Sequence, residues 1–191
     1  MLLIPTLALL WPVAHAALAF KGVDCSSLLV EEAAGHSYKN AAGTIQPLET
    51  ILANSGVNTL AKRAQAAGPH VYLDMHYSDS WADAGHQATP AAWASSTIDA
   101  LAAAVHNYTR AAMDAFQAAA TPLALVSLGN EITAGMLWPL GRLPSSPANL
   151  SRLLHAASAA IRASALAPQP RILLHLDNGW DWGTQQRWYD S

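Results

Sequence analysis

LALVSLGNE, residues 123–131, is the stretch that decides the fold. Its apolar run follows Pro122, which has no backbone N–H for a helix, and it ends at Gly129. A short apolar run between such boundaries is typical of a parallel strand that is covered on both faces. Polar side chains then begin abruptly with Asn130 and Glu131. Because α/β proteins assemble their sites at the carboxyl ends of parallel strands, these two are candidate site residues.

Two interpretations of Asn130 and Glu131 are open at this point. A carboxyl group at a strand end can donate a proton to a leaving group, and an amide beside it can hydrogen-bond a substrate hydroxyl. Alternatively, Asn130 caps the next helix, and Glu131 is a first-turn carboxylate that faces the helix dipole. The choice depends on what the neighbouring strands carry.

Strands and helices alternate on both sides of this stretch. Strands are predicted at residues 20–26, from Val57, at 70–77, at 123–131 and at 171–176. Helices are predicted at residues 45–52, 61–68, 98–116 and 146–161, with a further helix beginning after the last strand. Such alternation predicts a parallel sheet with helices outside it.

The chain is short for a closed barrel of this type. An eight-stranded barrel typically needs about 250 residues and rarely fewer than about 200, and this chain has 191. A parallel crossover with its helix takes at least about 10–12 residues. The segment between Leu60 and the strand that begins at His70 is shorter, so we expect that part of the second strand and its crossover is missing there.

Composition excludes several classes of partner. About half of the residues, 52%, are apolar and the formal net charge is −3, as in a globular domain with a sizeable core. The ten Lys and Arg residues are scattered without a run, so we expect neither a nucleic acid nor a membrane as partner. Cys25 is the only cysteine, so no internal disulfide can form.

Residues 1–16, MLLIPTLALLWPVAHA, are predicted to be a secretory signal peptide. Their apolar part is too short to span a bilayer and ends in a small-residue pattern that suits signal peptidase. The alternative is a buried amino-terminal strand. Two glycosylation triplets, at Asn107 and Asn149, fit export from a eukaryotic cell. We therefore expect a secreted, extracellular protein whose domain occupies residues 17–191.

Six stretches together match one family of enzymes. They are KGVDCSSLLVEEAAGHSYKN, IQPLETILANSGVNT, AKRAQAAG, VYLDMHYSDSWADAGHQATPAAW, SLGNEITAGMLWPLG and ILLHLDNGWDWGTQQRWYD. In these stretches the chain resembles the amino-terminal part of the arabinogalactan endo-β-1,4-galactanases of glycoside hydrolase family 53, particularly the fungal members. The resemblance implies the fold class α/β: an incomplete (β/α)8 TIM barrel with about strands one to five and most of strand two missing.

The resemblance also implies a reaction. It implies retaining hydrolysis of β-1,4-galactan in pectic arabinogalactan by a monomer without a cofactor, with Glu131 as acid/base and Asn130 bound to a substrate hydroxyl. A retaining mechanism needs a second carboxylate as nucleophile, which the family places at the end of strand seven. No glutamate follows Glu131 in this sequence. We therefore expect the chain as written to be inactive or nearly so.

Further substrate contacts are implied in the loops after strands three and five. These residues are His76, Asp79, Trp81, His175, Asp177 and Trp180. For His76, Trp81 and Trp138, packing is the alternative to sugar contact, and the tryptophans after strand five could instead form an aggregation patch. Loop residues His76, Asp79, Asp83 and His86 could be imagined as metal ligands, but their spacing matches no compact site, so we expect no metal.

Three other functions stay open on the sequence alone. One is a non-catalytic galactan-binding pseudoenzyme, and another is a fragment that does not fold. Within enzymes, a mannanase or cellulase of the same clan is the alternative, because the Asn-Glu pair of strand four is shared across that clan.

Overall fold

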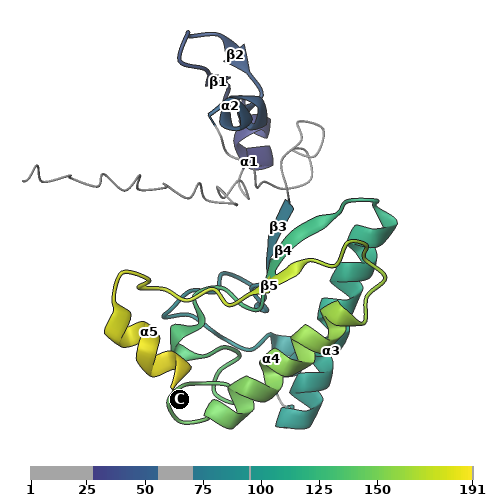
Figure 1. The fold of residues 1–191 in the computed structure, drawn as a ribbon, viewed down its shortest axis with the longest axis vertical. Helices are drawn as coiled ribbons and strands as arrows, with labels where there is room; N and C mark the ends of the chain where they lie inside the picture. The colour runs from purple at the N-terminus through teal and green to yellow at the C-terminus, as the bar shows by residue number, and fades with distance from the viewer. Residues whose placement is uncertain (1–27, 56–70, 95, 191) are drawn as a thin grey trace, which may run out of the picture.

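The structure is a computed structural model that describes residues 28–55, 71–94 and 96–190 (Figure 1). The predicted signal peptide, the first strand at 20–26, the strand from Val57 and the helix at 61–68 lie outside the described residues. Those predictions, and the expected gap after Leu60, are therefore not tested by the structure.

A three-stranded parallel sheet organises residues 71–190. It contains β3 (Val71–Asp74), β4 (Leu123–Ser127) and β5 (Arg171–Leu173) in the order β3-β4-β5. In the register of the sheet, Asp74 is opposite Ser127, and Ser127 is opposite Leu173, so the three carboxyl ends lie at one edge. Sequential parallel neighbours are the product of successive βα units. The predicted α/β class and parallel sheet are confirmed.

Two long helices connect these strands. Helix α3 (Ile98–Ala118) joins β3 to β4, and α4 (Pro147–Arg162) joins β4 to β5. Thr97 caps α3 by accepting a hydrogen bond from the Ala100 N–H at 3.3 Å, and the proline at the start of α4 occupies a position where no N–H is required. The two helices run side by side on one face of the sheet (Figure 1). The predicted helices at 98–116 and 146–161 are confirmed to within two residues.

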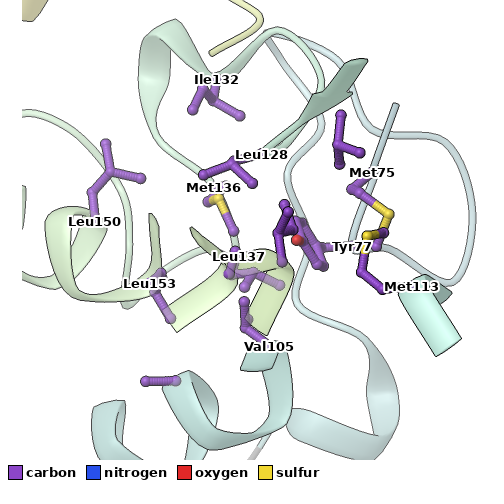
Figure 2. Close-up of a cluster of buried hydrophobic side chains, with 14 of the residues drawn as sticks. Met75, Tyr77, Val105, Met113, Leu128, Ile132, Met136, Leu137, Leu150 and Leu153 are labelled. Atoms are coloured by element: carbon purple, nitrogen blue, oxygen red, sulfur yellow. The ribbon is translucent and has the colours of Figure 1, made fainter. Parts of the chain in front are cut away.

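The core lies between this sheet and the two helices. Fully buried side chains come from both helices, such as Leu101 and Met113 of α3 and Leu153 and Ile161 of α4. Figure 2 shows that residues beyond the strand ends also enter this cluster. These are Met75, Tyr77, Leu128, Ile132, Met136 and Leu137. The loops that carry the candidate site are therefore anchored in the core.

Ile161 provides a direct test of this packing. Its side chain is 0% exposed, whereas Ile45 is 63% exposed. Ile161→Val removes one buried methylene and should lower the free energy of unfolding by about 0.5–1.5 kcal/mol. Ile45→Val makes the same change at the surface and should have almost no effect. Urea denaturation followed by circular dichroism measures both, and an equal loss in the two variants would contradict the packing described.

Residues 28–55 form short elements of their own. They are α1 (Leu28–Ala33), β1 (Tyr38–Lys39), β2 (Ile45–Gln46) and α2 (Leu48–Asn54). β1 and β2 pair antiparallel, and the Asn40 side chain holds the turn between them by accepting from the N–H groups of Ala42 and Thr44, each at 3.0 Å. The predicted helix at 45–52 is thus wrong at its start. Ile45 belongs to a hairpin, and the helix begins only after Pro47.

The strands are shorter than predicted. β3 ends at Asp74 rather than at residue 77, β4 ends at Ser127 rather than at residue 131, and β5 ends at Leu173 rather than at residue 176. Beyond the end of β5, the His175 carbonyl accepts a hydrogen bond from the Ile132 N–H, which lies outside the ladder. The 3-10 helices η2 (Ala91–Trp93) and η3 (Ile132–Ala134) follow β3 and β4, and α5 (Trp182–Tyr189) follows β5. Among the described residues, no helix combines the length and apolar character that crossing a membrane requires.

Candidate functional site

Three loops meet at the carboxyl edge of the sheet. We call them the β3 loop (residues 75–90), the β4 loop (residues 128–146) and the β5 loop (residues 174–181). All of the site residues predicted from the sequence lie on them. Because consecutive strands are neighbours, so are the loops that follow them.

Glu131 lies in the β4 loop with a left-handed backbone, φ 52° and ψ 48°. This region is uncommon for residues other than glycine, and strained residues of this kind cluster at functional sites. The side chain is half-buried, and its Oε2 accepts a hydrogen bond from the Ala84 N–H at 3.3 Å. The carboxylate is therefore held against the β3 loop.

Asn130 is buried and joins the same two loops. Its Nδ2 donates to the Ala82 carbonyl oxygen at 2.7 Å, and its own carbonyl accepts from Gln87 Nε2 at 2.7 Å. The residue that precedes η3 is Glu131, and no side chain caps that helix. The alternative that Asn130 is a helix cap is therefore wrong.

Gln87 was not among the residues predicted for the site. It is only 2% exposed, and its Nε2 also donates to the Asp83 carbonyl at 2.8 Å. Its own carbonyl accepts from the Trp138 N–H at 2.7 Å. One side chain thus fixes the turn of the β3 loop and bonds it to the β4 loop. The sequence gives no signal for this role, because it depends on a carbonyl 43 positions away.

Gln87→Ala should loosen the junction of the two loops. It leaves the buried carbonyl of Asn130 without a donor, which costs about 1–3 kcal/mol. We expect a corresponding fall in unfolding free energy and faster hydrogen exchange at the Trp138 amide. Gln117→Ala, at an exposed position on α3, is the matched control. Unchanged exchange at Trp138 in the Gln87 variant would contradict this role.

The predicted residues of the β3 loop have different surroundings. The rings of His76 and Trp81 meet edge to face with centroids 5.0 Å apart, and His76 Nδ1 accepts from the Ala82 N–H at 3.3 Å. Trp81 remains 59% exposed. Asp79 already holds the start of η2, since its Oδ2 accepts from the Ala91 N–H at 2.8 Å. Substrate contact by these three residues stays a prediction.

Asp83 and His86 pair at the surface of the same loop. His86 Nδ1 lies 2.8 Å from Asp83 Oδ1, and the Gly85 N–H donates to that oxygen at 2.8 Å. The hydrogen bond from His86, followed by the one from Gly85, holds the pKa of Asp83 below its usual value. Within residues 28–55, 71–94 and 96–190, no three His, Cys, Asp or Glu side chains are grouped as metal ligands.

The β5 loop is bonded to the β4 loop near Glu131. The Ile132 N–H donates to the His175 carbonyl at 2.9 Å, and the Asp177 N–H donates to Thr133 Oγ1 at 3.1 Å. The His175 side chain points the other way along the edge, where its Nδ1 lies 2.8 Å from Asp74 Oδ2. Trp180 is 86% exposed.

A hollow of about 730 Å³ lies between the β3 and β4 loops. Its lining includes the two indoles Trp81 and Trp138 and the polar side chains of Asp83, His86 and Gln87. Trp138 also packs, because its Nε1 donates to the Ala134 carbonyl at 3.0 Å and Arg142 lies 4.4 Å over its ring. Trp138 therefore packs within its own loop, and its contact with a sugar stays a prediction. Aromatic faces beside a few placed polar groups are typical of small-ligand sites.

These features define an α/β protein whose site is built from loops after successive parallel strands. The family model described as "Glycosyl hydrolase family 53" matches residues 59–191. The chain is 51% identical to the "Probable arabinogalactan endo-beta-1,4-galactanase A" of Aspergillus terreus, over 95% of this chain and 58% of that protein. A solved structure from work on two fungal beta-1,4-galactanases has a TM-score of 0.85 at 49% identity, covering 91% of this chain and 58% of that one.

The chain belongs to glycosyl hydrolase family 53, a family of glycoside hydrolases. The resemblance read from the sequence is thereby confirmed. The chain spans about 58% of the length of the Aspergillus terreus relative.

One alignment also bears on the expected internal gap. The relative of the same name from Neosartorya fischeri is 45% identical, and the alignment includes 100% of this chain and 60% of that protein. It runs over 213 positions, 22 more than the 191 residues of this chain. At least that number of aligned positions therefore has no residue in this chain, and the place of the expected gap stays a prediction.

Proposed function

We propose that this fold, completed to the length of its relatives, hydrolyses β-1,4-linked galactan of pectic arabinogalactan internally and with retention of configuration. The observation that carries the proposal is the placement of Glu131 beyond β4, half-buried and bonded to the β3 loop. The substrate class is supported by relatives named arabinogalactan endo-beta-1,4-galactanases. The barrel of which β3, β4 and β5 form a part is then a (β/α)8 barrel.

Glu131 is the acid/base in this proposal, and Asn130 binds the substrate beside it. The acid protonates the departing sugar oxygen and then activates water in the second step. The Asn130 Nδ2 donates to the Ala82 carbonyl, and in this proposal its Oδ1 accepts from the hydroxyl next to the reacting carbon. Such a contact strengthens as the oxocarbenium-like state forms.

The remaining contacts surround this pair. The exposed rings of Trp81 and Trp180 offer apolar faces for sugars, and His76 supports the first of them. Among the described residues, Asp177 Oδ1 is buried and has no hydrogen-bond partner. A buried acceptor without a donor lowers the stability of the fold. In this proposal a sugar hydroxyl donates the missing hydrogen bond. Asp79 would contact substrate through the oxygen that η2 does not use.

The 191 residues taken alone should bind galactan but not hydrolyse it. Retention needs two carboxyl groups about 5–5.5 Å apart, one of which attacks the anomeric carbon. No glutamate follows Glu131 in the sequence. We also propose that residues 1–16 are removed as a secretory signal and that residues 17–191 act outside the cell as a monomer.

Two measurements on purified residues 17–191 test this proposal. Isothermal titration with a β-1,4-linked galactotetraose should show binding, and a reducing-sugar assay on galactan should show no turnover. Robust hydrolysis would refute the account of the missing nucleophile. No binding, in a chain that unfolds cooperatively, would refute the assignment of the site. A non-catalytic galactan-binding protein would give the same two results. Hydrolysis of galactan by a chain completed to the length of its relatives distinguishes an enzyme from such a protein.

A further inference from the structure

The ends of the three strands share a hydrogen-bonded group of side chains that includes His175, one of the predicted substrate contacts. We call Asp74, Ser127 and His175 the strand-end cluster. Asp74 and Ser127 are the last residues of β3 and β4, and His175 follows β5 by two positions. The Ser127 hydroxyl, which is 0% exposed, donates to Asp74 Oδ1. The other carboxylate oxygen, Oδ2, lies 2.8 Å from His175 Nδ1.

The cluster faces away from the helices. Leu73 and Val126 pack in the core between the sheet and α3 and α4. Since side chains alternate along a strand, Asp74 and Ser127 point to the opposite face. Tyr72 lies on that face too. Burial raises the pKa of Tyr72 to about 12, with a hydrogen bond to Ser127 opposing the rise and the charge of Asp74 adding to it.

The chemistry of the cluster determines which ring nitrogen of His175 carries the proton. An ionised carboxylate only accepts hydrogen bonds, so Nδ1 must be the donor to Asp74. In a neutral ring, Nε2 then carries a lone pair. Within residues 28–55, 71–94 and 96–190, Nε2 has no hydrogen-bond partner, and the side chain is 37% exposed.

Backbone contacts fix this imidazole relative to Glu131. The His175 carbonyl accepts from the N–H of Ile132, the residue that follows Glu131, at 2.9 Å. The ring is held at Nδ1 by Asp74, and Asp74 is in turn held by Ser127. The backbone of His175 is thus held by the β4 loop and its ring by the last residue of β3. A carboxylate orients functional histidines in this way in other sites.

We propose that Asp74 is a positioning residue that holds His175 as its Nδ1–H tautomer, so that Nε2 accepts a hydrogen bond from a substrate hydroxyl beside Glu131. The role of the hydroxyl rests on the proposed function. The tautomer does not, because it is a property of the protein without substrate.

Nuclear magnetic resonance of the ¹⁵N-labelled 191-residue chain tests the tautomer directly. Long-range ¹H–¹⁵N correlations, assigned with His175→Gln, should show Nδ1–H in at least about tenfold excess over Nε2–H, as expected for a hydrogen bond to a charged group. Asp74→Ala removes the acceptor and should abolish this excess. Ser127→Ala removes only the second bond to Asp74, so it should keep the excess. A wild-type ring that is mainly Nε2–H would overturn the inference without any variant.

Titration with β-1,4-linked galactotetraose in the same experiment tests the contact. Binding should shift the Nε2 resonance, and Asp74→Ala should weaken binding about tenfold, while Ser127→Ala changes it less. Binding that leaves Nε2 unshifted would overturn the inference but not the proposed function. If no oligosaccharide binds but the ring is Nδ1–H, the tautomer is as inferred. The proposed function is then refuted, and so is the substrate contact of Nε2.

Discussion

Glu131→Gln is expected to slow galactan hydrolysis by roughly 10²–10⁴-fold in a completed chain, the range that general acid–base groups contribute. The completed chain is a chimera in which the Aspergillus terreus relative supplies every position that this chain lacks. Glutamine keeps the size of the side chain and an oxygen for the Ala84 N–H. It cannot donate a proton to the leaving oxygen, so the rate of hydrolysis should fall while the fold is kept.

The choice of substrate separates acid catalysis from simple disruption. A nitrophenyl galactoside has a leaving group that departs with little protonation, so its cleavage in Glu131→Gln should suffer much less than that of galactan. Asp114→Asn is the control, because that carboxylate is exposed on α3 and lies 2.9 Å from Arg110 Nε. Equal losses on both substrates would contradict the acid/base role. A completed chain that binds but never hydrolyses would instead favour a galactan-binding protein.

The central units of the fold could be predicted from the sequence because their patterns are local. The apolar run at 123–128 between Pro122 and Gly129 identifies β4, and apolar residues at helical spacing identify α3 and α4. Strand ends depend instead on the neighbouring strand. Nothing within HVYLDMHY shows that the ladder stops at Asp74, since that is decided where β4 ends at Ser127.

The hairpin at 38–46 was missed for a similar reason. Ile45 fits the helical spacing that continues into α2, so periodicity assigns it to the helix. Its pairing with Lys39 depends on the turn that Asn40 makes with the N–H groups of Ala42 and Thr44. A side chain that bonds to its own backbone can override a periodic pattern of this length.

The site was predictable only in part. Asn130 and Glu131 are conspicuous because polar residues follow an apolar run without a break. Asp74 is equally visible at the end of β3, but its partner His175 lies 101 positions away, and no local pattern connects them. Gln87 stands between His86 and Ala88 in a polar loop, where nothing indicates that its side chain is buried. Polar residues at a strand end can be recognised by type, whereas the side chains that hold them depend on the folded chain.

Gly135→Ala is expected to destabilise the β4 loop by about 3 kcal/mol or more. Gly135 has φ 84° and ψ −172°, a region open only to glycine, and adopting it with a side chain costs about 1–3 kcal/mol. An added Cβ would also lie 2.1 Å from the Gly141 carbonyl oxygen and 2.9 Å from the Leu143 nitrogen. Both are backbone atoms that cannot rotate away, so overpacking adds a cost of similar size.

Gly179→Ala is the matched control for this change. Gly179 lies in the β5 loop, and a Cβ there would meet no atom of the described residues within 4 Å. The free energy of unfolding should therefore change by no more than about 0.5 kcal/mol. Urea denaturation followed by circular dichroism measures both variants. Because this loop carries both Glu131 and the amide that bonds to Gln87, the Gly135 variant should also lose galactotetraose binding. A stable Gly135 variant that binds normally would show that the tight turn between Gly135 and Gly141 is not what holds Glu131 in place.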